Sequence, residues 1–368
     1  LAQLDALLAL GKAALCQAVA LAFDGDVAEP DRVFAATLLL GCTAERAWLN
    51  ILCERAALAC SRSPPEAAAA VEGLSLAPRG DLGAALAPWL GEADPRLRAS
   101  AVRVLGFRGE LAERDWQRAL QDADAGVVLA AARAPLHAYD ARACESALLP
   151  LLGRASESLT RAVLRAGATL RSPALHAQAR RCTQADGAWA QACLSMAMHG
   201  DLGDVALLRS VLHSPNWRDG VAAAACLGAA ALVPDLLALQ GAAEQAAMAQ
   251  ERASIVAALA AIGGESFAVA AHAADAGCRW RAIAHRFDAS RRWRAGAPLD
   301  AATLLRQLAG DSGTRDERAR LCVELRAMCA QRLPRFSPHA FVATQEADLR
   351  RIAQLLEGSR KVVVEATP

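Results

Sequence analysis

Composition and charge narrow the possibilities before any motif is considered. The 368-residue chain is 54% hydrophobic but only 4% aromatic, a composition that suits thin helices packed through Ala, Leu and Val and disfavours a β-sandwich. Its 40 Lys and Arg residues nearly balance 39 Asp and Glu residues, for a net charge of +1. This balance predicts neither a strongly basic nor a strongly acidic surface.

The N-terminal part of the chain predicts irregular helices. The segment Leu1–Phe23 is apolar, but polar and charged residues interrupt it, so it predicts an amphipathic helix rather than a signal peptide. Further helices are predicted at Asp31–Leu40, Ala44–Cys60 and Glu66–Gly73. No stretch reaches about 18 uninterrupted apolar residues, which indicates a soluble protein without a membrane partner. Because the chain begins at Leu1, we expect a start codon or a leading segment to precede it.

A repeated segment organises the middle of the chain. In Leu90–Gly106, Asp94 and Pro95 precede an apolar pattern of helical period that Gly106 closes, as in a capped helix. Steps of 30, 32, 30 and 30 residues carry the capping position to further residues with suitable side chains. The five predicted helix caps are Asp94, Asp124, Ser156, Asp186 and Asn216.

Shorter helices are predicted between these capped helices, so the array consists of helix-turn-helix units. The predicted first helices are Leu82–Leu90, Arg114–Leu120, Ser146–Leu152, Pro173–Cys182, Val205–Leu212 and Val233–Leu239. Glu251–Ile262 and a last pair in Ser266–Phe287 complete the run. The expected fold is an all-α solenoid. Its expected parts are an irregular helical cap over residues 1–62, a repeat array over 63–290 and a small α-rich block over 291–368.

The C-terminal block differs in character from the repeats. Arg291–Gly296 predicts a charged connector, and Asp300 can cap a helix that runs through Leu308. Thr314 and Glu317 have the spacing of a capping box, which predicts a second helix through about Gln331. Short extended segments are predicted at Phe336–Val342 and Lys361–Glu365, with a helix at Ala347–Leu356 between them.

Two resemblances bear on this organisation. The repeats, above all DPRLRASAVRVLG, resemble HEAT-like repeats of the kind also found in phycobilin lyases, over roughly Leu82–Phe287. LDALLALGKAALCQAVAL, EPDRVFAATLLL and RWRAGAPLDAATLLRQLAGDSGTRDERARLCVEL, together with the repeats, resemble an uncharacterised bacterial family often encoded beside type VI secretion genes. Members of that family typically carry an acidic, proline-rich insertion that is missing here between Phe287 and Trp293. The family brings no known catalytic residues.

The sequence carries no pattern typical of an enzyme or a metal centre. HExxH, GxSxG and Walker A motifs are all missing, and the eleven cysteines form no CxxC pair. We therefore expect the cysteines to be small core residues of a reduced, cytoplasmic protein. We expect no catalytic residue, no cofactor and no bound metal. We expect each of the seven histidines to lie in a turn or on the surface; they are His137, His176, His199, His213, His272, His285 and His339.

Arginines at one aligned position of the second helices form the candidate binding surface: Arg103, Arg133 and Arg165. Such arginines can contact phosphates, as in HEAT-like DNA glycosylases, can pair with neighbouring caps and carbonyls as a structural ladder, or can receive an acidic protein segment. The series stops at Ser195 and Ala225, and the net charge is close to zero. Both observations count against nucleic acid as the partner.

The expected function is that of a non-catalytic scaffold or adaptor, because stacked helix pairs present a continuous rigid surface on which protein segments bind. The resemblance to the secretion-associated family implies a secreted toxin or a spike component as the protein partner. The alternative function is that of a HEAT-like enzyme of the lyase or DNA glycosylase kind.

Overall fold

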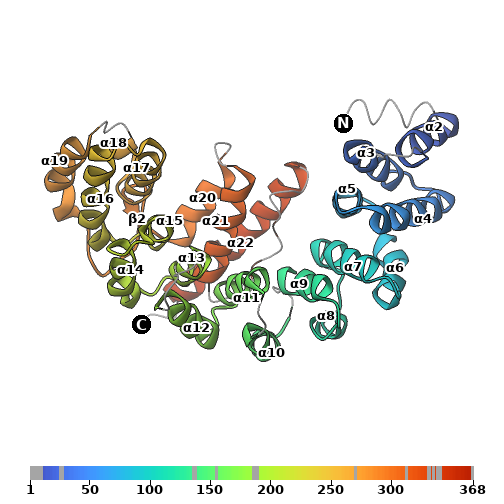
Figure 1. The fold of residues 1–368 in the computed structure, drawn as a ribbon, viewed down its shortest axis with the longest axis horizontal. Helices are drawn as coiled ribbons and strands as arrows, with labels where there is room; N and C mark the ends of the chain where they lie inside the picture. Colours follow the sequence, from blue (N-terminus) through green and yellow to red (C-terminus); the bar gives the residue numbers. More distant parts are fainter. Residues whose placement is uncertain are drawn as a thin grey trace. The chain divides into compact units, whose positions relative to one another are not determined.

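The protein is all-α and divides into two compact units. The computed structural model describes residues 11–24, 29–134, 139–153, 156–184, 190–268, 272–310, 314–329, 333, 336 and 342–365. Unit 1 extends to Tyr139 and unit 2 begins at Asp140. Strands in the described part of the chain are limited to one hairpin of two residues a side, and the other regular elements are helices (Figure 1).

Unit 1 consists of short helices that pack on their near neighbours in the chain. Helix α3 packs on α4 and α5, and α7 packs on α9. The elements are α2 (Lys12–Phe23), α3 (Pro30–Gly41), α4 (Arg46–Arg62), α5 (Pro64–Leu76), α6 (Leu82–Leu86), the 3-10 helix η1 (Ala87–Gly91), α7 (Pro95–Arg108), α8 (Glu113–Leu120) and α9 (Ala125–Arg133).

Unit 2 continues the alternation of first and second helices and ends with the C-terminal helices. Its described elements are α10 (Ala141–Leu148), η2 (Leu149–Gly153), α11 (Glu157–Leu170), α12 (Pro173–Gln184), α13 (Ala190–His199), η3 (Leu202–Asp204), α14 (Val205–Leu212), α15 (Trp217–Leu227), η4 (Ala230–Leu232), α16 (Val233–Gln245), α17 (Ala249–Gly263), α18 (Glu265–Ala268), α19 (Ala273–Ile283), η5 (Ala284–Arg286), β1 (Trp293–Arg294), β2 (Ala297–Pro298), α20 (Ala301–Ala309), α21 (Arg315–Met328) and α22 (Val342–Glu365). Second helices α11, α13, α15 and α17 pack in sequence, and first helices α12, α14 and α16 do the same.

These units do not follow the predicted parts of the chain. The boundary expected after residue 62 falls within unit 1, where α4 and α5 meet at Ser63 and pack on each other. The boundary expected after residue 290 falls within unit 2, because α21 packs on α11 and α13. The predicted array is thus divided between the two units, and its part from Asp140 onward forms one unit with the C-terminal helices.

Helix starts in the repeats depend on side-chain caps. Asp94 accepts a hydrogen bond from the amide of Arg96 at 2.9 Å, and Asp124 and Ser156 cap α9 and α11 in the same way. Asn216 precedes α15 but its side chain makes no capping bond, so the cap predicted there is wrong; Ser214 Oγ instead accepts from the Asn216 amide. The predicted cap Asp186 lies outside the described residues.

Several predicted helix limits need correction. Gly11 has a φ of 77°, outside helical backbone, so the helix expected over Leu1–Phe23 begins at Lys12 in the described residues. Helix α7 does not close at Gly106 but continues to Arg108, where Gly109 at a φ of 71° ends it. The strand expected at Lys361–Glu365 is the end of α22. The expected capping box is present, with Thr314 and Glu317 exchanging both bonds.

The segment predicted as a charged connector is instead docked on the repeats. Trp293 donates its amide to the Gly228 carbonyl at 2.7 Å, and the Arg292 guanidinium donates to the Leu227 carbonyl at 2.8 Å. Gly228 has a φ of 67° and leaves no room for a Cβ beside Trp293, so a side chain there would block the contact. Buried Arg294 pairs with buried Glu324 of α21. The segment thereby satisfies carbonyls at the end of α15.

No helix in the described part of the chain combines the length and the apolar character needed to cross a membrane. Buried Leu, Ala and Val side chains line the helix contacts of each unit, as the aromatic-poor composition predicts. In unit 2, one core of buried residues lies among the repeats and a smaller one lies among α20, α21 and α22.

Candidate functional site

Two of the three aligned arginines form an exposed pair in unit 1. Arg103 lies on α7 and Arg133 lies on the adjacent helix α9, and both residues are exposed. Partial desolvation of the Arg103 guanidinium lowers its pKa, and the positive charge of Arg133 lowers it further. Among the described residues, neither guanidinium has an ion-pair partner. We call these two residues the arginine pair.

Other arginines of unit 1 form hydrogen bonds between neighbouring elements of the fold, as expected of structural arginines. The Arg98 guanidinium binds both carboxylate oxygens of Asp122, at 2.8 and 2.9 Å, and thereby lowers the pKa of that carboxyl. Arg108 donates to the carbonyls of Ala77 and Arg79. Arg98 and Arg108, which lie outside the aligned position, thus link neighbouring helices, whereas Arg103 and Arg133 have no such ion pair among the described residues.

Arg165 has different surroundings. It lies on α11 in unit 2, where it lines a pocket of about 280 Å³ together with Gln191 and Met198 of α13 and with Glu317 and Arg320 of α21. The packing of α21 on α11 and α13 makes this pocket. Arg165 is exposed, as Arg103 and Arg133 are, but its neighbours include residues of the C-terminal helix α21.

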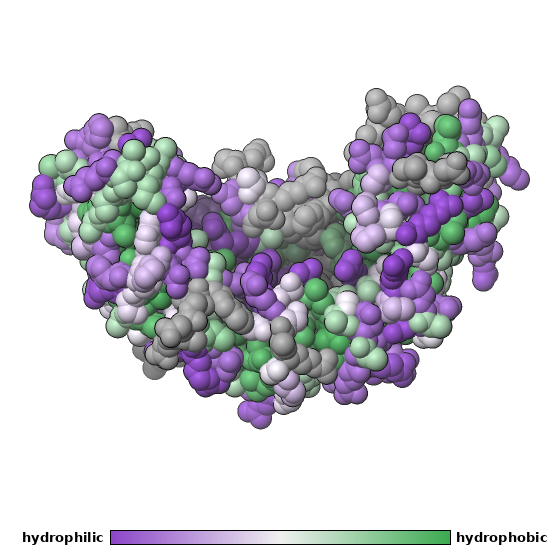
Figure 2. All heavy atoms as spheres, in the orientation of Figure 1, coloured by the Kyte–Doolittle hydropathy of each residue, from purple (hydrophilic) through white to green (hydrophobic). Residues whose placement is uncertain are grey.

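Hydrophilic and hydrophobic side chains alternate over the surface of each unit on the face shown in Figure 2. The apolar surface includes a shallow pocket of about 260 Å³ between α2 and α3, lined by Leu21 and Leu39 among others. Leu21 is 62% exposed. This mixed surface agrees with the nearly balanced charge of the chain.

A second candidate site, which the sequence did not indicate, lies in unit 2 at the start of α14. Asp204 is completely buried, and His176 and Arg180 reach it from α12. Residues four apart lie on the same face of a helix, so α12 directs both side chains at one carboxylate. His176 Nε2 lies 3.1 Å from Asp204 Oδ2, and Arg180 Nε lies 2.9 Å from Oδ1. We call these three residues the Asp204 cluster.

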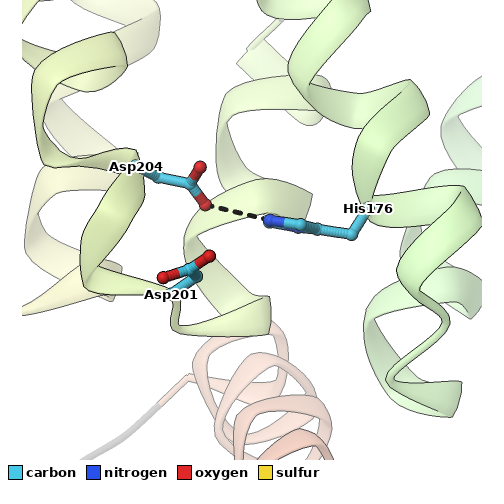
Figure 3. A group of neighbouring side chains, drawn as sticks. All are labelled: His176, Asp201 and Asp204. Atoms are coloured by element: carbon cyan, nitrogen blue, oxygen red, sulfur yellow. Dashed lines mark ion pairs between the residues drawn. The ribbon is translucent and has the colours of Figure 1, made fainter.

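Asp201 adds a second carboxylate beside this cluster. Its Oδ1 accepts from the Gly203 amide at 2.8 Å, which starts the single turn η3 that ends at Asp204. Figure 3 shows the His176 imidazole directed at Asp204 from α12, with the Asp201 carboxylate beside Asp204. One ligand atom from each of His176, Asp201 and Asp204 lies within 4.8 Å of the others.

The imidazole of His176 is tightly enclosed. Its side chain is 9% exposed, and the ring stacks on His199 with 4.0 Å between ring centroids. Burial lowers the pKa of His199, and the neighbouring His176 and Arg171 lower it further. The prediction that every histidine lies in a turn or on the surface is therefore wrong for His176, because the helices that bury it are distant in the sequence.

The next repeat carries a comparable group on its surface. His213 Nε2 lies 2.8 Å from Asp235 Oδ1, and Arg209 Nε lies 3.0 Å from Oδ2. Arg209 and His213 are four residues apart, and Asp235 is in the first turn of α16. The His213 side chain is 61% exposed. We call these three residues the Asp235 cluster.

The residues of the Asp204 cluster have only weak spacing signals in the sequence. Asp201 and Asp204 stand three residues apart between two apolar helix patterns, and His176 stands four residues before Arg180 on the preceding first helix. Neither spacing is specific, because exposed carboxylates commonly start helices. The burial of Asp204 is what distinguishes it, and burial comes from packing.

The cysteines only partly follow their prediction as core residues. All eleven are in the described part of the chain, and those that are buried are Cys60, Cys144, Cys193, Cys226 and Cys322. Burial raises the pKa of Cys193 to about 11. Cys16 and Cys278 are exposed, contrary to the prediction.

No protein-family model matches the chain, and a search of curated proteins returns no match.

Proposed function

We propose that the chain is a HEAT-like helical-repeat scaffold whose helix pairs form an α-solenoid and whose exposed surface binds a protein segment. The alternation of short first helices with capped second helices supports this fold within each unit, as does the packing of α11, α13, α15 and α17 in sequence. Repeats of this kind bury their apolar faces on each other and leave long surfaces for partners.

The contact surface that we propose is the arginine pair. Arg103 and Arg133 are exposed, adjacent and without a carboxylate partner among the described residues, and this observation carries the proposal. Two neighbouring guanidinium groups repel each other, so an anion bound between them relieves an unfavourable interaction as well as forming new bonds. A segment rich in Asp or Glu fits this chemistry.

The partner class that we propose is a secreted toxin or a spike component of a type VI secretion system, with this chain as an accessory protein. This part rests on the sequence resemblance alone. No reaction is assigned to the chain under this proposal, since a scaffold acts by holding its partner. The arginine pair then contributes affinity and association rate through charge complementarity.

A charge reversal tests the arginine pair. Replacing Arg103 and Arg133 with Glu should weaken the binding of a fluorescein-labelled, Asp- and Glu-rich peptide by about tenfold or more, measured by fluorescence anisotropy at low salt. The same variant should lose co-purified secretion components in a pull-down quantified by mass spectrometry. Thermal unfolding should change little, because exposed substitutions typically alter stability by about 0.5 kcal/mol or less.

A matched control separates this site from net charge. Arg114 and Arg118 of α8 have side chains that are 85% and 76% exposed, so reversing both gives the same total charge in the same unit. The control should retain most of the binding. Equal losses in the two variants would mean a diffuse electrostatic effect, and wild-type binding by the R103E/R133E variant would refute the proposal.

A further inference from the structure

We propose that His176, Asp201 and Asp204 form a binding site for a divalent transition-metal ion in unit 2. This site is independent of the arginine pair and of the scaffold role. It joins α12 to the turn η3, two elements of successive repeats.

The spacing of the donor atoms suits a single small ion. His176 Nε2 and Asp204 Oδ2 are 3.1 Å apart, and all three ligand atoms lie within 4.8 Å of one another. Two ligands that each lie about 2.1 Å from a tetrahedral ion are about 3.4 Å apart. The spacing of His176 and Asp204 therefore needs only a small adjustment to hold one ion, and Asp201 has to approach the other two ligands by at most about 1.4 Å.

Unsatisfied polar atoms provide the second, independent observation. Both ring nitrogens of His176 and both carboxylate oxygens of Asp204 are buried without a hydrogen-bond partner among the described residues, and Asp204 Oδ1 has an ion pair with Arg180 as its compensation. His176 and Asp204 are close, but their geometry is not that of a hydrogen bond. Buried polar atoms are nearly always satisfied in folded proteins, and a cation bound between the imidazole and the carboxylate would use lone pairs of both.

The local charge also favours a cation. Asp201 and Asp204 contribute two negative charges, and Arg180 contributes one positive charge through Asp204 Oδ1. With the imidazole neutral, as a metal ligand must be, one negative charge remains. Asp201 is exposed and the Arg180 side chain is 42% exposed, so ions and water can reach the site from solvent.

The donor set indicates the class of metal. One imidazole nitrogen with two carboxylate oxygens suits Zn²⁺ or Co²⁺, with water in the remaining position. Mg²⁺ and Ca²⁺ prefer sets of oxygen ligands, and Ca²⁺ takes six to eight of them. We therefore expect the site to take Zn²⁺ or Co²⁺ in preference to Mg²⁺.

Cobalt titration of the full chain tests the proposal. The protein is treated with a chelator, kept reduced with a phosphine and titrated with Co²⁺, with visible absorption as the readout and Zn²⁺ as the competitor. Wild type should bind one equivalent. His176→Ala and Asp201→Asn should each weaken binding by about tenfold or more. His213→Ala, the matched change in the Asp235 cluster, should bind as wild type does.

If circular dichroism shows that His176→Ala does not fold, Asp201→Asn still tests the proposal. This variant should fold, because its amide oxygen can still accept a hydrogen bond from the Gly203 amide. Binding that persists unchanged in Asp201→Asn would overturn the proposal, as would the failure of wild type to bind Co²⁺. A thiolate-to-cobalt charge-transfer band would also overturn it, because it would place the ion on one of the eleven cysteines.

Discussion

The Asp204 and Asp235 clusters use the same three residue types one repeat apart. In each, an Asp at the start of a first helix contacts a His and an Arg that are four residues apart, on the preceding first helix or, for His213, directly after it. The residues are His176, Arg180 and Asp204 in one cluster and Arg209, His213 and Asp235 in the other. Both clusters thus join neighbouring repeats through one carboxylate.

The two clusters differ in burial and in the residue three positions earlier. The His176 side chain is 9% exposed and that of His213 is 61% exposed. Asp201 precedes Asp204 by three residues, whereas the buried Leu232 precedes Asp235 by three. In the Asp235 cluster both carboxylate oxygens are hydrogen-bonded, to His213 and to Arg209, whereas the Asp204 cluster has a second carboxylate and buried His176 nitrogens without a hydrogen-bond partner among the described residues. The burial of His176 and the carboxylate of Asp201 are therefore the two features that distinguish the candidate metal site from the Asp235 cluster.

Removing each histidine should produce the largest contrast between the clusters. His176→Ala should lower the free energy of unfolding by about 2–3 kcal/mol, because it leaves a cavity beside His199 and removes a neighbour of a buried carboxylate. His213→Ala should cost about 0.5 kcal/mol or less, because its side chain is mostly in solvent. Urea unfolding in the presence of a chelator measures both. Equal losses would show that burial does not distinguish the clusters.

The two Arg–Asp pairs should also differ in how strongly salt weakens them, although this difference should be smaller than that between the histidine variants. The side chains of Arg180 and Arg209 are 42% and 45% exposed, so the pairs differ mainly in the burial of their carboxylates. A double-mutant cycle should give about 0.5 kcal/mol for Arg209 with Asp235 at low salt, and almost none in 1 M NaCl. The coupling of Arg180 with Asp204 should be about 1 kcal/mol and should largely survive salt. A parallel loss of both couplings would contradict this difference.

Asp201→Asn should have the smallest effect on stability. The asparagine oxygen can still accept from the Gly203 amide, so metal-free protein should unfold within about 0.5 kcal/mol of wild type. Thermal unfolding followed by circular dichroism in the presence of a chelator measures this. A larger loss would mean that the Asp201 charge supports the fold by itself, which would make Asp201 a structural residue like Asp235.

Local patterns in the sequence were sufficient to predict most helices and several of their starts. The caps Asp94, Asp124 and Ser156 and the capping box of α21 depend on bonds between residues two or three positions apart, which the sequence displays directly. Helix ends were less predictable. Gly106 continues α7 because Gly109 supplies the left-handed backbone that ends it, and either glycine could serve by sequence alone.

Helical period and capping chemistry in the sequence by themselves determine that this chain forms many short helices, since both act over a few residues. Tertiary structure decided which charged residues are buried or paired. Arg98 meets Asp122, while Arg103 meets no carboxylate in the described part of the chain. Asp204 is buried against His176, 28 positions earlier, and Arg294 pairs with Glu324, 30 positions later. Such contacts follow from how helices pack, and packing gathers residues whose spacing in the sequence carries no signal.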